Sequence, residues 1–313
     1  MSQTFLNVDV PFEVWQGNRS GGPWRAGDPR GVRLLRLESE LKQQQQTMAL
    51  AAWRVPVAHP SEHIGVLYAT RGSGGRRNWA VWPGDFDNSA HYKEVALKVA
   101  EVLVNAEGGR SGKDDGESPR IMLESLMRNY GFSDIVQEAL EGVHGWRRTY
   151  HNPCQLWVSA NEDLFHGAWE RGGADGVQPP LSIDNLLTHD AGLVDRAWEH
   201  RSDKSIDYVT RQIESAPSVC VRDAQGIPVA WAITHSDGAI GAMFVTEPWR
   251  RQGLGSVLVR ALARKHVESH GGVPPFCYIQ THNHPSQKLF RSLQFRPVLD
   301  TTWDGYEPAV ASS

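Results

Sequence analysis

Residues 247–256 read Glu-Pro-Trp-Arg-Arg-Gln-Gly-Leu-Gly-Ser, and they lie between a predicted strand and a predicted amphipathic helix. The two glycines let the backbone approach a ligand closely and adopt conformations that a Cβ would block. The N–H groups of Gln252 through Ser256 would then point at one spot, where the positive end of the helix dipole adds to their attraction for an anion. Such a backbone nest binds a pyrophosphate without a lysine. The stretch therefore predicts a phosphate-binding turn.

Two other phosphate-binding motifs fit this stretch badly. A Walker loop needs Gly-Lys followed by Ser or Thr, and the sequence contains no such tripeptide. The dinucleotide-binding fingerprint needs a third small residue where Leu258 stands, and it belongs to a βαβ unit. Here the turn follows a predicted meander instead.

The elements predicted around the turn have a clear order. Helical patterns at 188–201 and 205–215 precede strands at 218–222, 229–234 and 239–246, and the short turns between these strands indicate an antiparallel meander. The next helix has its apolar residues on one stripe: Leu254, Val257, Leu258, Ala261 and Leu262. A strand at 276–281, a short helix at 285–293 and a strand at 295–299 follow.

In this setting, Arg250-x-x-Gly253-x-Gly255 resembles motif A of the GNAT-type N-acyltransferases, in which the loop holds the pyrophosphate of an acyl-CoA. The strand–helix–strand that follows, with Asn283 and Ser286, is similar to the closing half of that family, so the resemblance covers residues 182–300. The stretches at 216–222 (Ala-Pro-Ser-Val-Cys-Val-Arg) and 226–231 (Gly-x-Pro-Val-x-Trp) further resemble the glycine N-acyltransferase-like subfamily.

This resemblance implies a fold of the α/β (α+β) class: a GNAT fold with a mixed, largely antiparallel central sheet flanked by helices, preceded by a second α/β domain. We expect an irregular arm at 1–30 and, at 31–172, a domain resembling the N-terminal domain of glycine N-acyltransferases. A linker rich in Gly and Pro follows at 173–180, and the acyl-CoA-binding catalytic domain occupies 181–313.

Within 31–172 the patterns are more diffuse. They predict helices at 34–48, 95–103 and 120–130, and strands at 63–70, 78–82 and 155–159. Ser133 is the predicted N-cap of a further helix. The glycine-rich loop 71–77 contains arginines, but no helix pattern follows it directly, so we interpret it as a hairpin loop rather than a phosphate site. No internal repeat is obvious.

The composition excludes several classes of protein. The 313 residues carry 32 Lys and Arg against 36 Asp and Glu, a formal net charge of −4, which argues against a nucleic-acid or anionic-membrane partner. No apolar run approaches the roughly 18 residues of a membrane span. Three scattered cysteines predict reduced, buried thiols in an intracellular compartment, which we expect to be cytoplasmic, with a mitochondrial location as the alternative.

The resemblance implies which residues hold the acyl-CoA or acetyl-CoA cosubstrate. The strand at 243–245 would pair through its backbone with the pantetheine arm, and an N–H near Val245 would polarise the thioester carbonyl. The two arginines could instead be solvated charges at a helix start. The full expected set is Met243, Phe244, Val245, Arg250, Arg251, Gln252, Gly253, Leu254, Gly255, Ser256, Asn283 and Ser286.

The expected general base is missing from its usual position. In the glycine acyltransferase pattern a glutamate stands where this chain has Ala239, and the wider family's general acid, a tyrosine, is replaced by Phe290. Candidate substitutes are His235, Asp237, Glu247 and His282, because each carries a group able to take a proton. A metal is not expected, because His282-x-His284 offers only two ligands.

The resemblance therefore implies an N-acyltransferase that moves an acyl group from CoA to the amine of a small acceptor, such as glycine or another amino acid. Direct attack in a ternary complex is favoured, because no cysteine stands beside an obvious base. Two alternatives stay open: an acetyl-CoA acetyltransferase acting on a small amine or a protein N-terminus, and a catalytically silent CoA-binding module. The oligomeric state stays open as well.

Overall fold

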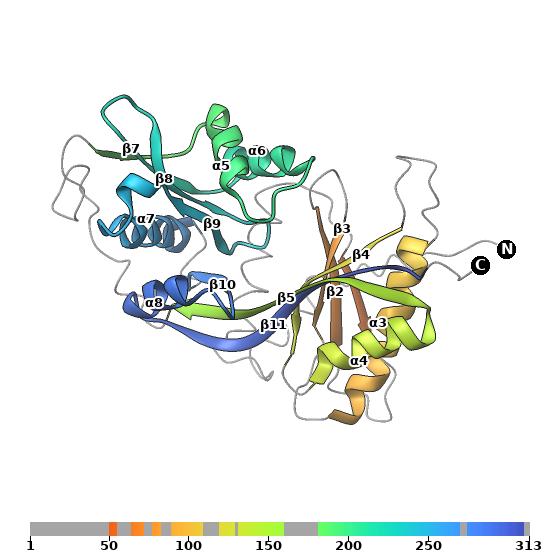
Figure 1. Cartoon of the computed structure of the whole chain (residues 1–313). Helices are drawn as coiled ribbons and strands as arrows, with labels where there is room; N and C mark the ends of the chain where they lie inside the picture. Colours follow the sequence, from red (N-terminus) through yellow and green to blue (C-terminus); the bar gives the residue numbers. More distant parts are fainter. Residues whose placement is uncertain are drawn as a thin grey trace.

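The strands of this protein join into one sheet. The computed structural model describes residues 50–54, 64–71, 77–82, 89–108, 119–128, 131–159, 181–269 and 274–309. Over these residues the sheet has eleven strands in the order β1-β2-β3-β4-β11-β5-β10-β9-β8-β7-β6 (Figure 1). Neighbours are antiparallel except β3 with β4 and β9 with β10. The prediction of a mixed, largely antiparallel sheet is confirmed.

The first half of the chain supplies strands β1 to β5. Its elements are β1 (Leu50–Arg54), β2 (Ile64–Arg71), β3 (Arg77–Trp82), α3 (Ser89–Gly108), β4 (Ile121–Met127), α4 (Phe132–Glu138), a π-helical turn (Ala139–Val143) and β5 (Trp146–Ser159). The predicted hairpin at 63–70 and 78–82 is confirmed, because β2 pairs antiparallel with β3. Helices α3 and α4 pack against each other and cover one face of this half of the sheet (Figure 1).

From β7 onward, the second half repeats the order of the elements described in the first half. It contains β6 (Ser182–Asp184), a 3₁₀ turn (Thr188–Asp190), α5 (Ala191–Ala197), α6 (Ser205–Ser215), β7 (Ser218–Arg222), β8 (Pro228–Thr234), β9 (Ile240–Val245), a 3₁₀ turn (Glu247–Trp249), α7 (Leu254–Ser269), β10 (Phe276–Gln280), α8 (His284–Ser292) and β11 (Phe295–Pro308). Both halves therefore run meander, helix, strand, helix, strand, a repeat that the sequence does not make obvious.

The two halves exchange their last strands. β5 of the first half pairs with β10 of the second, and β11 pairs with both β4 and β5. The linker predicted at 173–180 lies outside the described residues, as do the arm at 1–30 and the helix at 34–48. Strands from both sides of that linker share one sheet, because hydrogen bonding between strands joins segments that are distant in sequence.

Alternate residues of β8 divide the second half into two cores. Ala230 and Ala232 pack beneath α7, whereas Trp231 and Ile233 pack beneath α5 and α6. This alternation follows from the pleat of a strand that is buried on both faces. The helices α5 and α6 therefore cover the face of the sheet opposite to α7.

Two predictions for the first half are wrong. Residues 121–127 form strand β4, not a helix, because β4 lies between β3 and β11 and is buried on both faces. A strand buried in this way loses the alternation that identifies it in a sequence. Ser133 does not cap α4: the N-cap is Gly131, whose φ of 72° is left-handed, and Ser133 lies inside the helix.

Within the described residues, no helix is both long and apolar enough to cross a membrane.

Candidate active site

The turn between β9 and α7 exposes a group of backbone N–H donors. Arg251 and Gly253 have positive φ angles of 61° and 81°. The first hydrogen bonds of α7 run from the N–H groups of Ser256 and Val257 to the carbonyl of Gly253, at 2.9 and 3.2 Å. In the part of the chain that the structure describes, the N–H groups of residues 251–255 have no acceptor. They stand at the positive end of a sixteen-residue helix and are free to donate to an anion.

The side chains of this turn fold back onto β9 and its 3₁₀ turn. The Nε of Arg250 donates to the carbonyl of Val245 at 3.0 Å, and its guanidinium pairs with Glu247 at 2.6 Å. The Nε2 of Gln252 donates to the carbonyl of Pro248 at 3.0 Å. The backbone donors of the turn are thus available to an anion without any movement, whereas Arg250 must first leave Glu247.

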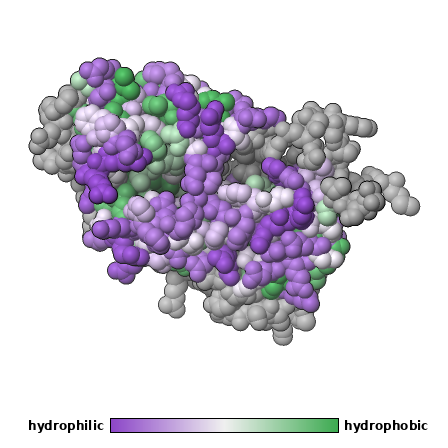
Figure 2. Space-filling model, viewed as in Figure 1, coloured by the Kyte–Doolittle hydropathy of each residue, from purple (hydrophilic) through white to green (hydrophobic). Residues whose placement is uncertain are grey.

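Strands β9 and β10 part beside this turn. They pair in parallel only at Ile240 and Cys277, so no strand among the described residues lies beside the rest of β9 on that side. Figure 2 shows a hollow lined by hydrophobic residues next to β9, between the α7 and α8 sides of the molecule. The strands thus separate toward the end of β9, and the turn that carries the free N–H groups follows that end.

The register of β9 decides which backbone groups face the opening. Thr246 donates its N–H to Val229 of β8 at 2.9 Å, which makes Val245 a non-hydrogen-bonded position of the pair. The N–H and C=O groups of Val245 consequently point away from β8, into the opening, and the register of the pair shifts between Phe244 and Gly241, at Ala242 and Met243. The N–H and C=O groups of Phe244 are turned toward β8, so of the three residues expected to pair with a ligand through their backbone, Phe244 is not in position.

Asn283 and Ser286 belong to the start of α8. Asn283 is the N-cap, and its Oδ1 accepts a hydrogen bond from the Ser286 N–H at 3.1 Å. Helix α8 approaches α7 closely at Gly255, where an added Cβ would lie 3.1 Å from Leu289. Gly255 therefore allows this contact, in addition to its place in the turn.

The structure separates the four candidate bases. Asp237 is buried, and its Oδ1 accepts a hydrogen bond from the Ala239 N–H at 3.1 Å. Glu247 is exposed and pairs with Arg250, and His282 is exposed at the start of the turn into α8. His235 is half-buried at the turn between β8 and β9. Ala239, at the family's base position, is 1% exposed, and Phe290 packs in the core, so neither position supplies a proton-transfer group. His235 is the candidate that the fold brings against the start of β9.

Three contacts fix the ring of His235. The Tyr208 hydroxyl lies 2.9 Å from its Nδ1, and the indole ring of Trp198 lies 5.9 Å from the imidazole ring. The Nε2 faces Gly241 of β9 so closely that a Cβ on that glycine would lie 2.1 Å away. Burial lowers the pKa of His235, although the nearby Asp237 opposes the shift. The imidazole of His235 is therefore uncharged at neutral pH.

The partners of His235 were not predicted. Tyr208 is on the inner face of α6, and a helical pattern marks that position only as core. Trp198 is the residue after α5, and its ring stacks on Tyr208 at 5.5 Å between centroids. No local pattern connects these residues with a histidine 27 positions after Tyr208.

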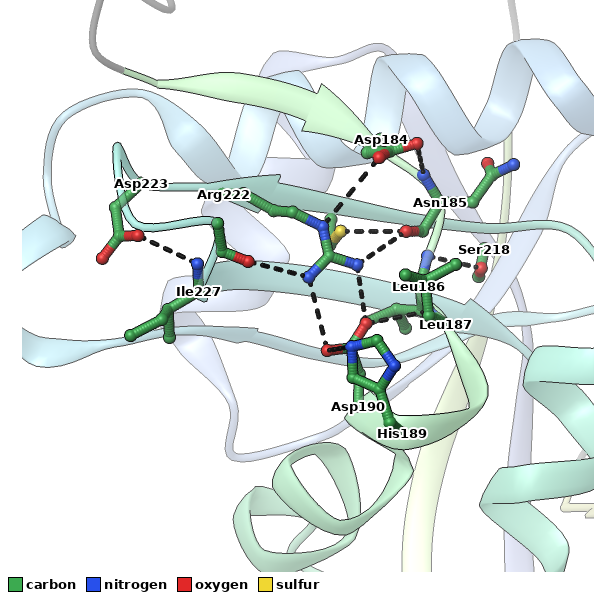
Figure 3. A network of polar contacts seen from close by, with 12 residues as sticks. Asp184, Asn185, Leu186, Leu187, His189, Asp190, Ser218, Arg222, Asp223 and Ile227 are labelled. Atoms are coloured by element: carbon green, nitrogen blue, oxygen red, sulfur yellow. Dashed lines mark hydrogen bonds and ion pairs between the residues drawn. The ribbon is translucent and has the colours of Figure 1, made fainter.

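A buried ion pair holds α5, and with it Trp198, against β7. Arg222 donates to Asp190 at 2.6 Å, and the two side chains are 9% and 4% exposed (Figure 3). Arg222 also donates to the carbonyls of Asn185 and Gly226, so its donors are well satisfied. Asp190 in turn accepts from the N–H of Leu187 and closes the 3₁₀ turn before α5.

The cysteines are buried and unsuited to act as nucleophiles. Burial raises the pKa of Cys154 and of Cys220 to about 12 each, and it raises that of Cys277 as well. The thiolate is the nucleophilic form, so these thiols are inert at neutral pH.

Part of this chain is similar in sequence to known proteins. The family model described as FR47-like protein matches residues 220–304. Glycine N-acyltransferase-like protein 1 of Homo sapiens is 26% identical over 147 residues, which cover 45% of this chain and 48% of that protein. Glycine N-acyltransferase of Bos taurus is 26% identical over 129 residues, 41% of this chain and 43% of that protein. The matches span about half the length of these relatives.

Solved structures resemble the chain over most of its length. A Drosophila protein is 17% identical and has a TM-score of 0.66, with 90% of this chain and 91% of that one covered. A tandem GNAT protein from the clavulanic acid biosynthesis pathway is 14% identical, with a TM-score of 0.50 and coverage of 92% and 91%. At these sequence identities, structural similarity establishes the fold alone. The chain therefore has a GNAT fold, and its residues 220–304 match the model of the FR47-like family.

Proposed function

We propose that this protein is an acyl-CoA-dependent N-acyltransferase that transfers an acyl group from a CoA thioester to the amine of a small acceptor. One observation carries the proposal: the free N–H groups of residues 251–255 adjoin the opening between β9 and β10. A pyrophosphate fits the first feature and an extended arm bearing amides fits the second. The names of the curated relatives, glycine N-acyltransferases, support the same chemistry.

The backbone would carry most of the binding. The nest at residues 251–255 would hold the CoA pyrophosphate, and Arg250 and Arg251 would add positive charge beside it. The C=O group of Val245 would pair with a pantetheine amide as a neighbouring strand does. The Val245 N–H faces the opening, and it would donate to the thioester oxygen as negative charge develops there.

His235 would act as the general base. A neutral amine attacks the thioester carbonyl to form the C–N bond, His235 takes one proton from that nitrogen, and the C–S bond breaks. The CoA thiolate leaves and accepts the proton from the imidazolium. The lowered pKa of His235 supports this role, because the ring is then ready to accept a proton at neutral pH. The inert cysteines favour this direct attack over an acyl-enzyme.

A matrix of acyl-CoAs and amines, with free thiol followed over time, tests the proposal. We expect thiol release that requires both the acyl-CoA and an amine, together with the N-acyl product by mass spectrometry. Tight CoA binding without turnover over the whole matrix would refute it. That result would favour a silent CoA-binding module, a reading that the buried Ala239 and Phe290 support.

A further inference from the structure

The side chain of Arg250 lies on the backbone group of β9 that an extended ligand would use. Its Nε donates to the Val245 carbonyl at 3.0 Å, and its Cζ lies 5.5 Å from the centre of the Phe244 ring. Val245 is a non-hydrogen-bonded position of the β8–β9 pair, so its carbonyl faces away from β8. This contact, the Arg250 cover, therefore occupies the acceptor that a ligand amide would need.

Glu247 holds the Arg250 cover in place. Its Oε2 lies 2.6 Å from the Nη1 of Arg250, and both residues belong to the short turn that follows β9. The side chains of Arg250 and Glu247 are 47% and 81% exposed, so water screens their ion pair and it contributes little. The cover is therefore held weakly enough for a competing anion to displace it.

The place for such an anion follows Arg250 directly in the chain. The backbone N–H nest at residues 251–255 stands at the positive end of α7. A pyrophosphate in this nest would offer the guanidinium several charged oxygen atoms, and charge-assisted bonds to them would replace the bond to Glu247. Arg250 would then leave the Val245 carbonyl. A ligand with the same arm but without phosphate would have to displace Arg250 with no such compensation.

We propose that Arg250 selects acyl donors that carry a pyrophosphate, because it covers the Val245 carbonyl until the phosphates draw the guanidinium away. This inference rests on the proposed acyl transfer and adds a residue that determines donor specificity. Thioesters of CoA are admitted, and thioesters of bare pantetheine are disfavoured. Arg250 attracts the first class and obstructs the second, so its removal should change the two affinities in opposite directions.

Calorimetry of the full chain with acetyl-CoA and with acetyl-pantetheine, without an acceptor amine, tests this selection. For Arg250→Ala we expect the Kd for acetyl-CoA to rise about fivefold or more and the Kd for acetyl-pantetheine to fall about twofold or more. Acetyl-pantetheine is uncharged, so a lost charge alone would not improve its binding. Arg264→Ala is the matched control, because it breaks the ion pair with Glu268 on α7 and should change neither Kd.

The variant Glu247→Gln tests the cover while Arg250 stays in place. It removes the ion pair, so Arg250 is held less firmly on Val245 and the Kd for the uncharged acetyl-pantetheine should fall about twofold. Glu268→Gln, which breaks the pair with Arg264 instead, should leave that Kd unchanged.

The two proposals fail in different ways. Opposite changes of the two Kd values in Arg250→Ala, without thiol release from any acyl-CoA and amine, support the Arg250 cover and refute the proposed transfer. A weaker affinity for acetyl-CoA with no gain for acetyl-pantetheine refutes the cover and leaves the transferase proposal standing. An absence of acetyl-CoA binding to the wild type refutes both.

Discussion

The substitution Gly241→Ala tests the placement of His235 most directly. Gly241 has no positive φ, so alanine fits the backbone, and the whole effect arises from one contact. The added Cβ would lie 2.1 Å from the Nε2 and 2.2 Å from the Cδ2 of His235, where ordinary contact begins near 3.4 Å. The imidazole must move by more than an ångström or leave its place altogether.

The size of the effect follows from that contact. Overpacking of a buried position lowers the free energy of unfolding by about 1–3 kcal/mol, and we expect a protein of this size still to fold. General base catalysis contributes roughly 10²–10⁴-fold, and we expect Gly241→Ala to lose a comparable part of kcat, because the displaced nitrogen no longer meets the amine. KM for the acyl-CoA should change little, because the nest at residues 251–255 is not touched.

The pH profile gives a second readout. Burial lowers the pKa of His235, so the acid limb of kcat in the wild type should lie below the ordinary value of 6.5. A ring displaced toward water regains its ordinary pKa, and the acid limb should then move upward. The same depressed pKa means that folding stability is complete above pH 6.5 and falls as the pH drops below it.

Two controls make the test decisive. Gly142→Ala meets nothing within 4 Å and has an ordinary φ, so it should leave rate and stability near wild type. In a His235→Ala background, Gly241→Ala should cost nothing further in kcat, because both changes remove the same group. A Gly241→Ala enzyme with wild-type kcat and an unmoved acid limb would refute the assignment of His235 as the base.

Three further predictions concern the frame of the site. Asp190→Asn should lower the free energy of unfolding by about 3–5 kcal/mol in urea, because it leaves the buried Arg222 without its charge partner; a loss below 1 kcal/mol would contradict the buried ion pair. Gly253→Ala should raise the Kd for CoA in calorimetry about five- to thirtyfold, because a left-handed alanine costs about 1–2 kcal/mol at this turn. Gly226→Ala, with a similar φ of 77° in the β7–β8 turn, is its control and should not change that Kd. The three cysteines should react with a thiol reagent only after unfolding, and native protein treated with iodoacetamide should keep its activity; rapid labelling of the native protein would show that they are not buried.

Much of the second half can be read from the sequence because its information is local. The helix at 205–215 and the strand at 218–222 have the predicted limits, since amphipathic spacing and turn residues mark both ends of each. The glycine pattern at 253–255 likewise indicates the turn, because a left-handed φ is a property of single residues. In the first half, β4 is buried on both faces, and a pattern of apolar residues alone cannot tell such a strand from a helix.

The sequence by itself determined the turn at 250–255 and the meander before it, because each depends on neighbouring residues. It also shows directly that position 239 is an alanine and not a glutamate. Only the tertiary structure decided that β5 and β11 exchange places between the halves, and that Tyr208, Trp198 and Gly241 meet at His235. Glu199 reaches Gln280 across 81 positions in the same way. Strand pairing and side-chain packing join residues that are far apart along the chain, and no local periodicity records which partner each will find.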